Sequence, residues 1–285
     1  MGRGPKLTSG SEGSYRLGPD DPGRPAEPGR DAVLDLPVDR DPGRIAAMFG
    51  GIAGRYDLMN RLMTMGLDRR WRRVAARQAA LSPGDCALDV CCGTGDLSFS
   101  LVDDCPGCAV TGLDFTPEMI SLARKKAAAR ARLGRPAQLG FVEGDVLDLP
   151  FAEGEFAAVT VGWGVRNVPD VPRAFAEMAR VTRPGGRVVC LESTVAPEGL
   201  GRRFHGVWMG RVVPLAGRIV TGDAAAYAYL PASVEAFPRA DGLARIMAAA
   251  GLVKVRYRRF GLGAVAIHVG ETPGAPGRTS AVVAP

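Results

Sequence analysis

The sequence lacks the segments that direct a chain into or across a membrane. None of its 285 residues belongs to an apolar run approaching the roughly 18 residues that a membrane-spanning helix needs. The N-terminal residues contain no apolar core of the kind found in secretory signals, and they carry too many acidic side chains for a transit peptide. We therefore expect a soluble, cytoplasmic protein.

Neither sign of charge is in large excess. The net charge is +6, and residues 1–44 hold seven basic and eight acidic residues, which leaves 29 basic and 22 acidic residues in the remainder. This mild, dispersed positive charge fits an anionic ligand or an anionic membrane surface. It is too weak to indicate nucleic-acid binding, so we predict no nucleic-acid partner.

Cysteine pairs with the arrangement of a zinc site are also missing. The six cysteines are residues 86, 91, 92, 105, 108 and 190, and most stand in apolar, strand-like contexts. We therefore expect reduced thiols in the core. The segment Cys105-Pro-Gly-Cys108 has the spacing of a redox motif, but no second pair accompanies it, and we predict neither a redox role nor a metal site.

Large apolar side chains are scarce at both ends of the chain. Residues 1–44 contain eight Gly and seven Pro, and such a segment buries too little apolar surface to offset its ordering entropy. We predict disordered tails at 1–44 and 271–285, with one folded domain at 45–270 between them.

Within that domain, helical and strand-like patterns alternate. Helical periodicity covers 45–78, 97–104, 117–133, 171–182 and 241–251, and apolar strand-like runs cover 86–91, 109–114, 138–144, 156–162, 186–192, 252–260 and 263–270. Strands that alternate with crossover helices predict an α/β fold with N-terminal helices and a seven-stranded, mostly parallel sheet. The last two runs are joined by a short loop, which predicts a hairpin and one antiparallel strand at the sheet edge.

One inserted segment, 197–238, does not follow the alternation. It mixes arginines with large apolar residues, namely Arg202, Arg203, Phe204, Trp208, Met209, Arg211, Val212 and Arg218. Ligands of open α/β sheets bind at the carboxyl ends of the strands. We therefore predict that this insertion is a helical lid over that edge.

The sharpest local motif is the run 87–98, ALDVCCGTGDLS. A strand ends near Cys91, and Gly93-Thr94-Gly95 leads directly into a helix. Glycines allow a tight turn and the close approach of a ligand, and a helix N-terminus presents free N–H groups. A nicotinamide or flavin site would use a similar turn. However, the dinucleotide pattern has Gly or Ala where Ser98 stands, and Asp89 precedes the glycines as in S-adenosylmethionine (SAM) enzymes.

Polar groups that suit a nucleoside follow the next two strands. Asp114 ends the second strand, 19 residues after Gly95, where a carboxylate can accept hydrogen bonds from both ribose hydroxyls. The alternative for Asp114 is a solvated turn residue. Asp145 and Val146 follow the third strand, where the carboxylate and the Val146 N–H can bind an adenine. The alternative for Asp145 is a helix-capping aspartate.

With these motifs in order, residues 48–270 resemble class I SAM-dependent methyltransferases, and more narrowly the C-methyltransferases of ubiquinone and menaquinone biosynthesis. The runs that carry the resemblance are 56–73, 162–170, 179–192, 223–238 and 263–270. It implies a Rossmann-like sheet and a SAM site formed by Asp89, Gly93, Thr94, Gly95, Asp114, Asp145, Val146 and, through its backbone alone, Gly162. Asp68 stands where the first of these motifs usually has His.

The resemblance implies methylation of a ring carbon of a prenylated quinol. The Cys91-Cys92 form of the glycine turn looks more like the menaquinone branch, which favours demethylmenaquinol over the 2-polyprenyl-benzoquinol of ubiquinone biosynthesis. Two alternatives stay open. One is a SAM-dependent methyltransferase for another phenolic or polyketide-like molecule, and the other is a non-catalytic SAM-binding subunit, because a fold does not fix a substrate.

Catalytic residues are expected after the fourth strand. The segment 165–168, VRNV, differs from the Asn-Pro-Pro-Tyr-like clamp of enzymes that methylate exocyclic amines, which favours carbon methylation. A quinol carbon becomes nucleophilic when an adjacent hydroxyl loses its proton. We predict that Arg166 stabilises the oxyanion, Asn167 orients a ring oxygen or a water, and Asp57 accepts the proton. The alternatives are a surface ion pair between Arg166 and Asp170, and a capping or helix-surface role for Asp57.

A polyprenyl quinol resides in the bilayer, so the enzyme must reach a membrane. We predict peripheral contact of the lid arginines with an anionic membrane surface. The alternative is a lid helix that faces the core and leaves its arginines in solvent. The sequence leaves open whether the protein is a monomer or a homodimer.

Overall fold

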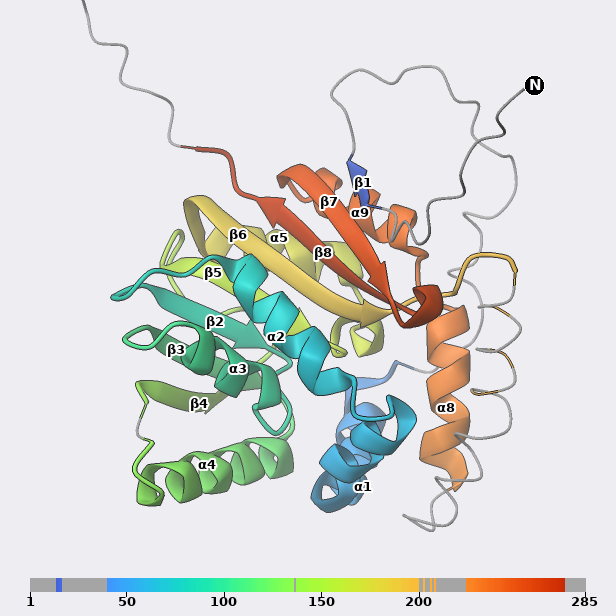
Figure 1. Cartoon of the computed structure of the whole chain (residues 1–285), viewed down its shortest axis with the longest axis horizontal. Helices are drawn as coiled ribbons and strands as arrows, with labels where there is room; N and C mark the ends of the chain where they lie inside the picture. Colours follow the sequence, from blue (N-terminus) through green and yellow to red (C-terminus); the bar gives the residue numbers. More distant parts are fainter. Residues whose placement is uncertain are drawn as a thin grey trace, which may run out of the picture.

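The structure is a computed structural model of the chain, and it describes residues 14–16, 40–135, 137–199, 202, 206, 208 and 224–274. Its strands form one sheet in the order β1-β7-β8-β6-β5-β2-β3-β4 (Figure 1). These strands are β1 (Ser14–Arg16), β2 (Cys86–Val90), β3 (Ala109–Asp114), β4 (Leu139–Glu143), β5 (Phe156–Gly162), β6 (Thr182–Ser193), β7 (Val253–Phe260) and β8 (Val265–Glu271). The helices are α1 (Pro42–Met63), α2 (Asp68–Ala79), α3 (Asp96–Asp104), α4 (Pro117–Arg132), η2 (Val165–Asn167), α5 (Val171–Val181), α8 (Ala224–Glu235), α9 (Ala240–Ala249) and η4 (Gly261–Gly263).

The seven predicted strands all form, and β1 adds a short eighth. Strands β2 to β6 pair in parallel, and β8 pairs antiparallel with both β6 and β7. The antiparallel strand was expected at the sheet edge, but β8 lies between β6 and β7. The long connection through α8 and α9 lets β7 run parallel to β6 one position away, and the three-residue turn η4 folds β8 back into the gap.

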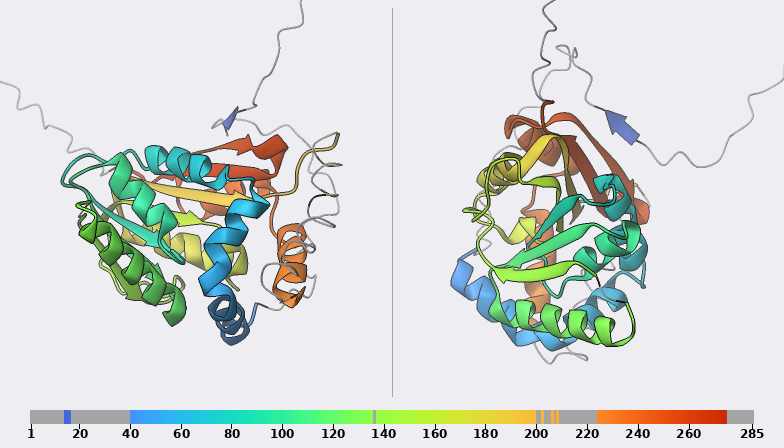
Figure 2. Two further views of the ribbon diagram at one scale, coloured as in Figure 1. Left: turned by 60° about the horizontal axis from the view of Figure 1, so that its bottom comes forward. Right: turned by 90° about the vertical axis from the view of Figure 1, so that its left-hand side faces the viewer.

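Alternate residues of the central strands supply two cores, one on each face of the sheet. On one face, Leu88, Val159 and Val188 pack with α5 and α9. On the other face, Ala87, Ala158, Val189 and their neighbours pack with α2 and α3. Because side chains alternate along a strand, one run of apolar residues covers both faces. Figure 2 shows the helices on either side of the sheet.

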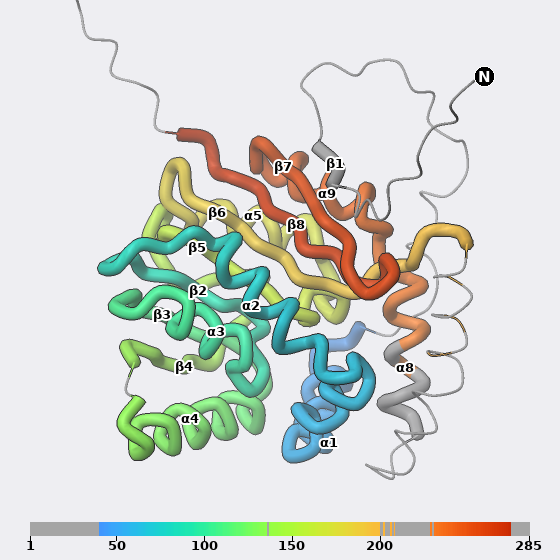
Figure 3. Tube along the Cα trace, viewed as in Figure 1, coloured from blue at the N-terminus to red at the C-terminus, as the bar shows by residue number. Residues whose placement is uncertain are grey.

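Two separate N-terminal helices replace the single helical run predicted at 45–78. Helix α1 starts at Pro42 because Asp41 caps it, with the Asp41 Oδ1 atom accepting a 2.9 Å hydrogen bond from the Arg44 N–H. It ends before a turn in which Met65 and Gly66 both have positive φ angles. Helix α1 packs against α4, beside the carboxyl ends of the parallel strands, and α2 crosses the sheet (Figure 3).

The boundaries of the predicted tails also differ from the structure. Strand β1 lies inside the predicted N-terminal tail, where it pairs with β7 at the edge of the sheet, an interaction that the local sequence does not signal. At the other end, Thr272 is buried and its hydroxyl donates to the Arg183 carbonyl oxygen, so ordered structure continues past residue 270. Helix α1 also begins inside the predicted N-terminal tail, at Pro42. Residues 1–13, 17–39 and 275–285 lie outside the described residues.

The predicted lid falls largely outside the described residues. Arg203, Phe204, His205, Met209, Arg211, Val212 and Arg218 are among the residues that the structure does not describe. Of the described lid residues, Arg202 lies 3.9 Å from Glu198, and Trp208 donates from its Nε1 atom to the Met63 carbonyl oxygen at 2.9 Å. The lid therefore contacts α1. In the described part of the chain, no helix is long and apolar enough to span a bilayer.

The expectation of six reduced cysteines is wrong for one pair. Cys105 and Cys108 form a disulfide, and their Cα atoms lie 5.7 Å apart. Cys105 is the C-cap of α3, and Gly107, with a φ of 94°, reverses the chain between the two cysteines. This turn geometry overrides the apolar context that favoured free thiols. The other four cysteines are free.

Candidate functional site

The glycine turn connects β2 to α3 with a backbone that requires glycine. Gly93 and Gly95 have φ angles of 55° and 85°, which side chains disfavour. A Cβ atom at Gly95 would lie 2.6 Å from the Phe141 ring, so this position excludes every larger residue. A Cβ atom at Gly93 would meet nothing closer than the Tyr56 ring, at 3.9 Å. The turn therefore leaves open space between its backbone and α1.

Asp114 ties the glycine turn to the end of β3. Its Oδ2 atom accepts a 2.8 Å hydrogen bond from the Gly93 N–H, and its Oδ1 atom accepts a 2.9 Å bond from the Thr116 N–H. Burial raises the pKa of the Asp114 carboxyl, and these two N–H groups oppose the rise. Each carboxylate oxygen still has a lone pair for a ligand hydroxyl.

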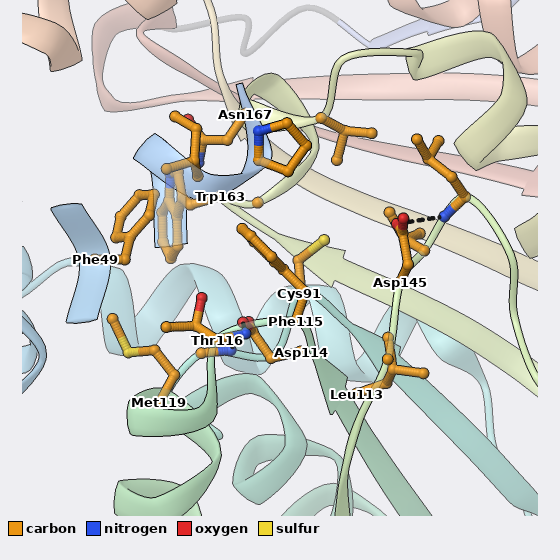
Figure 4. A pocket seen from close by; sticks show the side chains of 18 of the residues that line it. Phe49, Cys91, Leu113, Asp114, Phe115, Thr116, Met119, Asp145, Trp163 and Asn167 are labelled. Atoms are coloured by element: carbon orange, nitrogen blue, oxygen red, sulfur yellow. Dashed lines mark hydrogen bonds between the residues drawn. The ribbon is translucent and has the colours of Figure 1, made fainter. Parts of the chain in front are cut away.

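A cavity of about 770 Å³, open to solvent on one side, adjoins Asp114. The side chains that Figure 4 labels around it come from α1, α4 and η2, from the ends of β2, β3 and β5, and from the segment after β4. They are Phe49, Cys91, Leu113, Asp114, Phe115, Thr116, Met119, Asp145, Trp163 and Asn167.

Asp145 and Val146 form part of this cavity wall, after the end of β4. The Asp145 Oδ1 atom accepts a 2.9 Å hydrogen bond from the Leu147 N–H (Figure 4), which fixes the turn. Asp145 therefore stabilises a turn in this segment and does not cap a helix. Val146 is buried in the core on the face of the sheet that packs with α5 and α9.

Aromatic side chains from elements far apart in the sequence line the cavity. Phe49 of α1 and Trp163, which follows β5, are two of them (Figure 4). Trp163 has a φ of 58°, unusual for a bulky residue. The guanidinium carbon of Arg72 lies 4.8 Å from the centre of the Trp163 ring, within the range of a cation–π contact. Helix α2 thus supports the cavity wall from behind.

A second, smaller cavity of about 320 Å³ lies on the other side of the glycine turn. Tyr56, Cys91 and Gly93 line both cavities. The smaller cavity is more polar, and the residues lining it include Arg72, Asp89, Thr94, Asp96 and Gly162.

Asp89 and Arg72 both line this smaller cavity, and each is held by buried partners. Asp89 is fully buried and accepts hydrogen bonds from the hydroxyls of Ser98 (2.6 Å) and Thr160 (2.8 Å). Burial raises the pKa of the Asp89 carboxyl to about 6. Arg72 forms a buried ion pair with Asp68 and lies 3.5 Å from Asp96. The Asp that replaces the usual His at position 68 therefore holds Arg72.

Asp57 itself lines neither cavity, but it belongs to a charged cluster that reaches the smaller one through Thr94 and Asp96. Its Oδ1 atom accepts a 2.6 Å hydrogen bond from the Thr94 hydroxyl, and its Oδ2 atom lies 2.9 Å from the Lys126 Nζ atom. Lys126 also pairs with Asp96. This network joins α1, the glycine turn and α4.

Arg166 and Asn167, both in η2, take up different positions. Asn167 lines the larger cavity, and its Oδ1 atom accepts a 3.1 Å hydrogen bond from the Tyr229 hydroxyl of α8. Arg166 is buried behind the wall, where its Nη1 atom lies 2.8 Å from the Glu192 Oε1 atom and 2.7 Å from the Trp163 carbonyl oxygen. The alternative of a surface pair between Arg166 and Asp170 is wrong.

Asp170 is instead the N-cap of α5, where its Oδ1 atom accepts a hydrogen bond from the Arg173 N–H. The Arg166 guanidinium stays charged in its buried position because the neighbouring Glu192 carboxylate raises its pKa against the opposing effect of burial.

Phe49, Arg72, Trp163 and Glu192 were not among the predicted site residues. Arg72, Trp163 and Glu192 stand inside three of the motifs that carry the family resemblance, and that position was the available signal. Phe49 has no comparable signal, because it reaches the site through the packing of a helix.

Comparisons with known proteins agree with this architecture. The model of the ubiE/COQ5 methyltransferase family matches residues 38–272. A demethylmenaquinone methyltransferase of Thermus thermophilus is 46% identical, over 79% of this chain and 100% of the relative. The ubiquinone/menaquinone biosynthesis C-methyltransferase UbiE of Desulfotalea psychrophila is 40% identical, over 82% of this chain and 92% of the relative.

A solved structure supports the fold. A chain from the complex between the Trm112 methyltransferase activator of Haloferax volcanii and a methyltransferase aligns with a TM-score of 0.54, over 79% of this chain and 97% of that chain, at 18% identity. This likeness and the sheet order confirm the predicted Rossmann-like α/β fold. Because the family model spans most of the sequence and the curated relatives are covered over nearly their whole length, the chain belongs to the ubiE/COQ5 methyltransferase family.

Proposed function

We propose that this methyltransferase transfers a methyl group from SAM to a ring carbon of demethylmenaquinol, forming menaquinol. The observation that carries the proposal is one cavity lined by two kinds of side chain. Asp114, Asp145 and Asn167 supply polar groups, and Phe49 and Trp163 supply aromatic rings. A polar nucleoside and a flat apolar ring would each find matching chemistry there.

The residues of the two cavities fit SAM. The Asp114 carboxylate suits the ribose hydroxyls, and the Asp145–Val146 turn suits the adenine. The smaller cavity brings the Arg72 guanidinium and the Asp96 carboxylate together beside the glycine turn. Those two opposite charges suit the carboxylate and ammonium groups of the methionine end. When bound, SAM supplies a methyl group made electrophilic by its sulfonium.

The protein's own groups then orient the quinol and exclude water. The Asn167 Oδ1 atom accepts a hydrogen bond from the Tyr229 hydroxyl. The Nδ2 group of Asn167 is therefore free to donate a hydrogen bond to a ring oxygen. Burial raises the pKa of the Tyr56 hydroxyl, which therefore keeps its proton and can donate a second hydrogen bond. Donors aimed at a developing phenolate favour its formation and make the adjacent ring carbon nucleophilic.

Arg166 and Asp57 fit supporting roles better than direct ones. The Arg166 guanidinium holds the Trp163 carbonyl oxygen and the Glu192 carboxylate, so it fixes the turn that carries Asn167. Asp57 holds the Thr94 hydroxyl at the glycine turn. We assign both as positioning residues. Their predicted roles as oxyanion stabiliser and proton acceptor require contact with the quinol, which a structure of the quinol complex would test.

The names of the relatives support the substrate. The Thermus protein is named for demethylmenaquinone, and the Desulfotalea protein for both quinone pathways. A prenylated quinol implies a protein that works in the cytoplasm and at the inner face of the membrane.

The test uses the purified chain, methyl-labelled SAM and two short-chain substrates, a demethylmenaquinol and a 2-polyprenyl-benzoquinol. We expect the label on a ring carbon of the naphthoquinol, identified by mass and by NMR of the product. Methylation of the benzoquinol alone would move the protein to ubiquinone biosynthesis. Label on oxygen, or SAM binding with no transfer to either quinol, would overturn the proposal. Complementation of a strain blocked in menaquinone methylation is the matching test in cells.

A further inference from the structure

Four exposed apolar residues gather where α1 turns into α2. Leu58, Leu62, Met65 and Leu67 lie within ten residues of one another, and Met65 is 61% exposed. They make up four of the nine large apolar side chains that are exposed in the described part of the chain. We call residues 58–73, the end of α1, the turn and the start of α2, the α1–α2 elbow. Such a concentration of exposed apolar surface marks an interaction site.

The turn of the elbow is well ordered by its own hydrogen bonds. The Gly66 N–H donates to the Arg61 carbonyl oxygen at 2.7 Å, and the Thr64 hydroxyl donates to the Asn60 carbonyl oxygen at 2.7 Å. Met65 adopts a φ of 53°, a backbone conformation that is unfavourable for residues with a side chain. The fold thus holds Met65 on the surface in an unfavourable backbone conformation, although burial would suit its side chain.

The exposed charges of the elbow all have one sign. Residues 42–79 contain eight Arg and two acidic residues, and both acids have ion-pair partners: Asp57 pairs with Lys126, and the buried Asp68 pairs with Arg72. Arg69, Arg70 and Arg73 are exposed, and none of the three has an ion-pair partner within the described ranges. At about 100° per helical residue they fall within one third of the circumference of α2.

We propose that the α1–α2 elbow docks on the surface of an anionic phospholipid bilayer. Apolar side chains rimmed by arginines are the features of a segment that inserts at the lipid headgroup level. The other face of α1 carries Phe49 and Tyr56, which line the larger cavity. A membrane at the elbow would lie beside the helix that covers the site. The choice of a bilayer over an acidic protein rests on the proposed function, because a prenylated quinol partitions into lipid.

The first experiment measures binding to vesicles of phosphatidylcholine with phosphatidylglycerol, and to vesicles of phosphatidylcholine alone. The wild-type chain should bind the anionic vesicles, and added salt should weaken this binding. The variant R69E/R70E/R73E should bind at least about 100-fold more weakly, because each arginine near an anionic surface contributes about fivefold. The variant L62S/M65S should also bind the anionic vesicles more weakly than wild type. A change in salt concentration should not restore this binding.

The matched control reverses the same number of charges elsewhere. K125E/R132E/R173E changes exposed residues of α4 and α5 that have no ion pair among the described residues. It changes the net charge by the same amount, and it should bind within about threefold of wild type because screening limits long-range attraction. Equal loss of binding in this control and in the elbow variant would overturn the proposal, as would undiminished binding of the elbow variant.

A second readout separates this proposal from the proposed function. The charge-reversal variant R69E/R70E/R73E should methylate a water-soluble, short-chain demethylmenaquinol at the wild-type rate. It should lose activity only with a long-chain quinol in vesicles. Normal methylation by a wild-type chain that binds no vesicles would overturn the docking proposal alone. Vesicle binding through the elbow without methylation of any quinol would overturn the proposed function alone. If R202E/R203E/R211E/R218E abolishes vesicle binding and the elbow variant does not, the lid is the docking surface and the elbow is not.

Discussion

Asp89 and His268 are expected to give the protein opposite pH dependences of stability over the same pH range. Burial raises the pKa of the Asp89 carboxyl from 3.8 to about 6, and burial lowers the pKa of His268 from 6.5 to about 4. The His268 Nε2 atom lies 2.7 Å from the Ala240 carbonyl oxygen, and its Nδ1 atom has no hydrogen-bond partner in the described part of the chain. Both side chains are almost fully buried, so folding favours the neutral form of each.

The two contributions have opposite signs. The contribution of Asp89 is fully present below pH 3.8, and it is lost as the pH rises through about 6. The contribution of His268 is fully present above pH 6.5, and it is lost as the pH falls through about 4. A shift of about two pKa units corresponds to roughly 3 kcal/mol. Between about pH 4 and 6 the two terms should nearly cancel in the wild-type protein.

Urea unfolding at a series of pH values tests this cancellation. In Asp89→Asn only the histidine term remains, so the free energy of unfolding should rise by about 3 kcal/mol between pH 4 and pH 6.5. In His268→Phe only the carboxyl term remains, and the free energy of unfolding should fall over the same range. Glu153→Gln, at an exposed carboxyl, is the control and should follow the wild-type profile. The reasoning is refuted if both buried-site variants keep the wild-type slope.

Three further predictions concern the site. Gly95→Ala should destabilise the protein by about 2–4 kcal/mol more than Gly84→Ala, as measured by chemical denaturation. Both glycines have φ near 90°, but only a Cβ atom at Gly95 would meet a phenylalanine ring, at 2.6 Å. Asp114→Ala should weaken SAM binding by about 2–3 kcal/mol, the size of a hydrogen bond to a charged group, and unchanged affinity by calorimetry in a folded variant would disprove the ribose contact. Glu192→Gln should cost about 3–5 kcal/mol of stability, because it leaves the Arg166 guanidinium buried without its carboxylate, and replacing both residues with apolar ones should restore part of that loss.

Apart from Asp57 of α1, the site residues that the sequence identified lie at or near the end of a parallel strand. Asp114, Asn167 and the glycine turn follow apolar runs that are recognisable as strands, and the carboxyl ends of parallel strands meet at one edge. Local patterns were therefore enough to group these residues. The partners of Arg166 were not predictable in this way. Gly162 pairs with Leu191 in the sheet. The next residue of β6, Glu192, therefore lies beside η2. The position of Glu192 depends on the register between β5 and β6, which no local pattern reveals.

The helical side of the site was also beyond local patterns. Phe49 reaches the cavity because α1 packs against α4, and Asp57 meets Lys126 across 69 residues of sequence for the same reason. Helical periodicity predicts which face of a helix is buried, but it does not predict which element covers that face. The Cys105–Cys108 disulfide was missed for a related reason, since it depends on the φ angle of Gly107.

Of the six non-glycine residues with positive φ angles in the described part of the chain, two line the cavities. Cys91 and Trp163 have positive φ angles of 50° and 58°, and they follow the adjacent strands β2 and β5. A Cβ atom at Gly164 would lie 2.3 Å from the Cys91 Cβ atom, so the two turns are in close contact. Each left-handed non-glycine residue costs about 1–2 kcal/mol. The surrounding packing must impose these conformations, and the turns they form separate the strand ends and orient Trp163 toward the cavity. A relaxed backbone at Trp163 would move a side chain that lines the larger cavity, so the shape of that cavity depends on this strained turn.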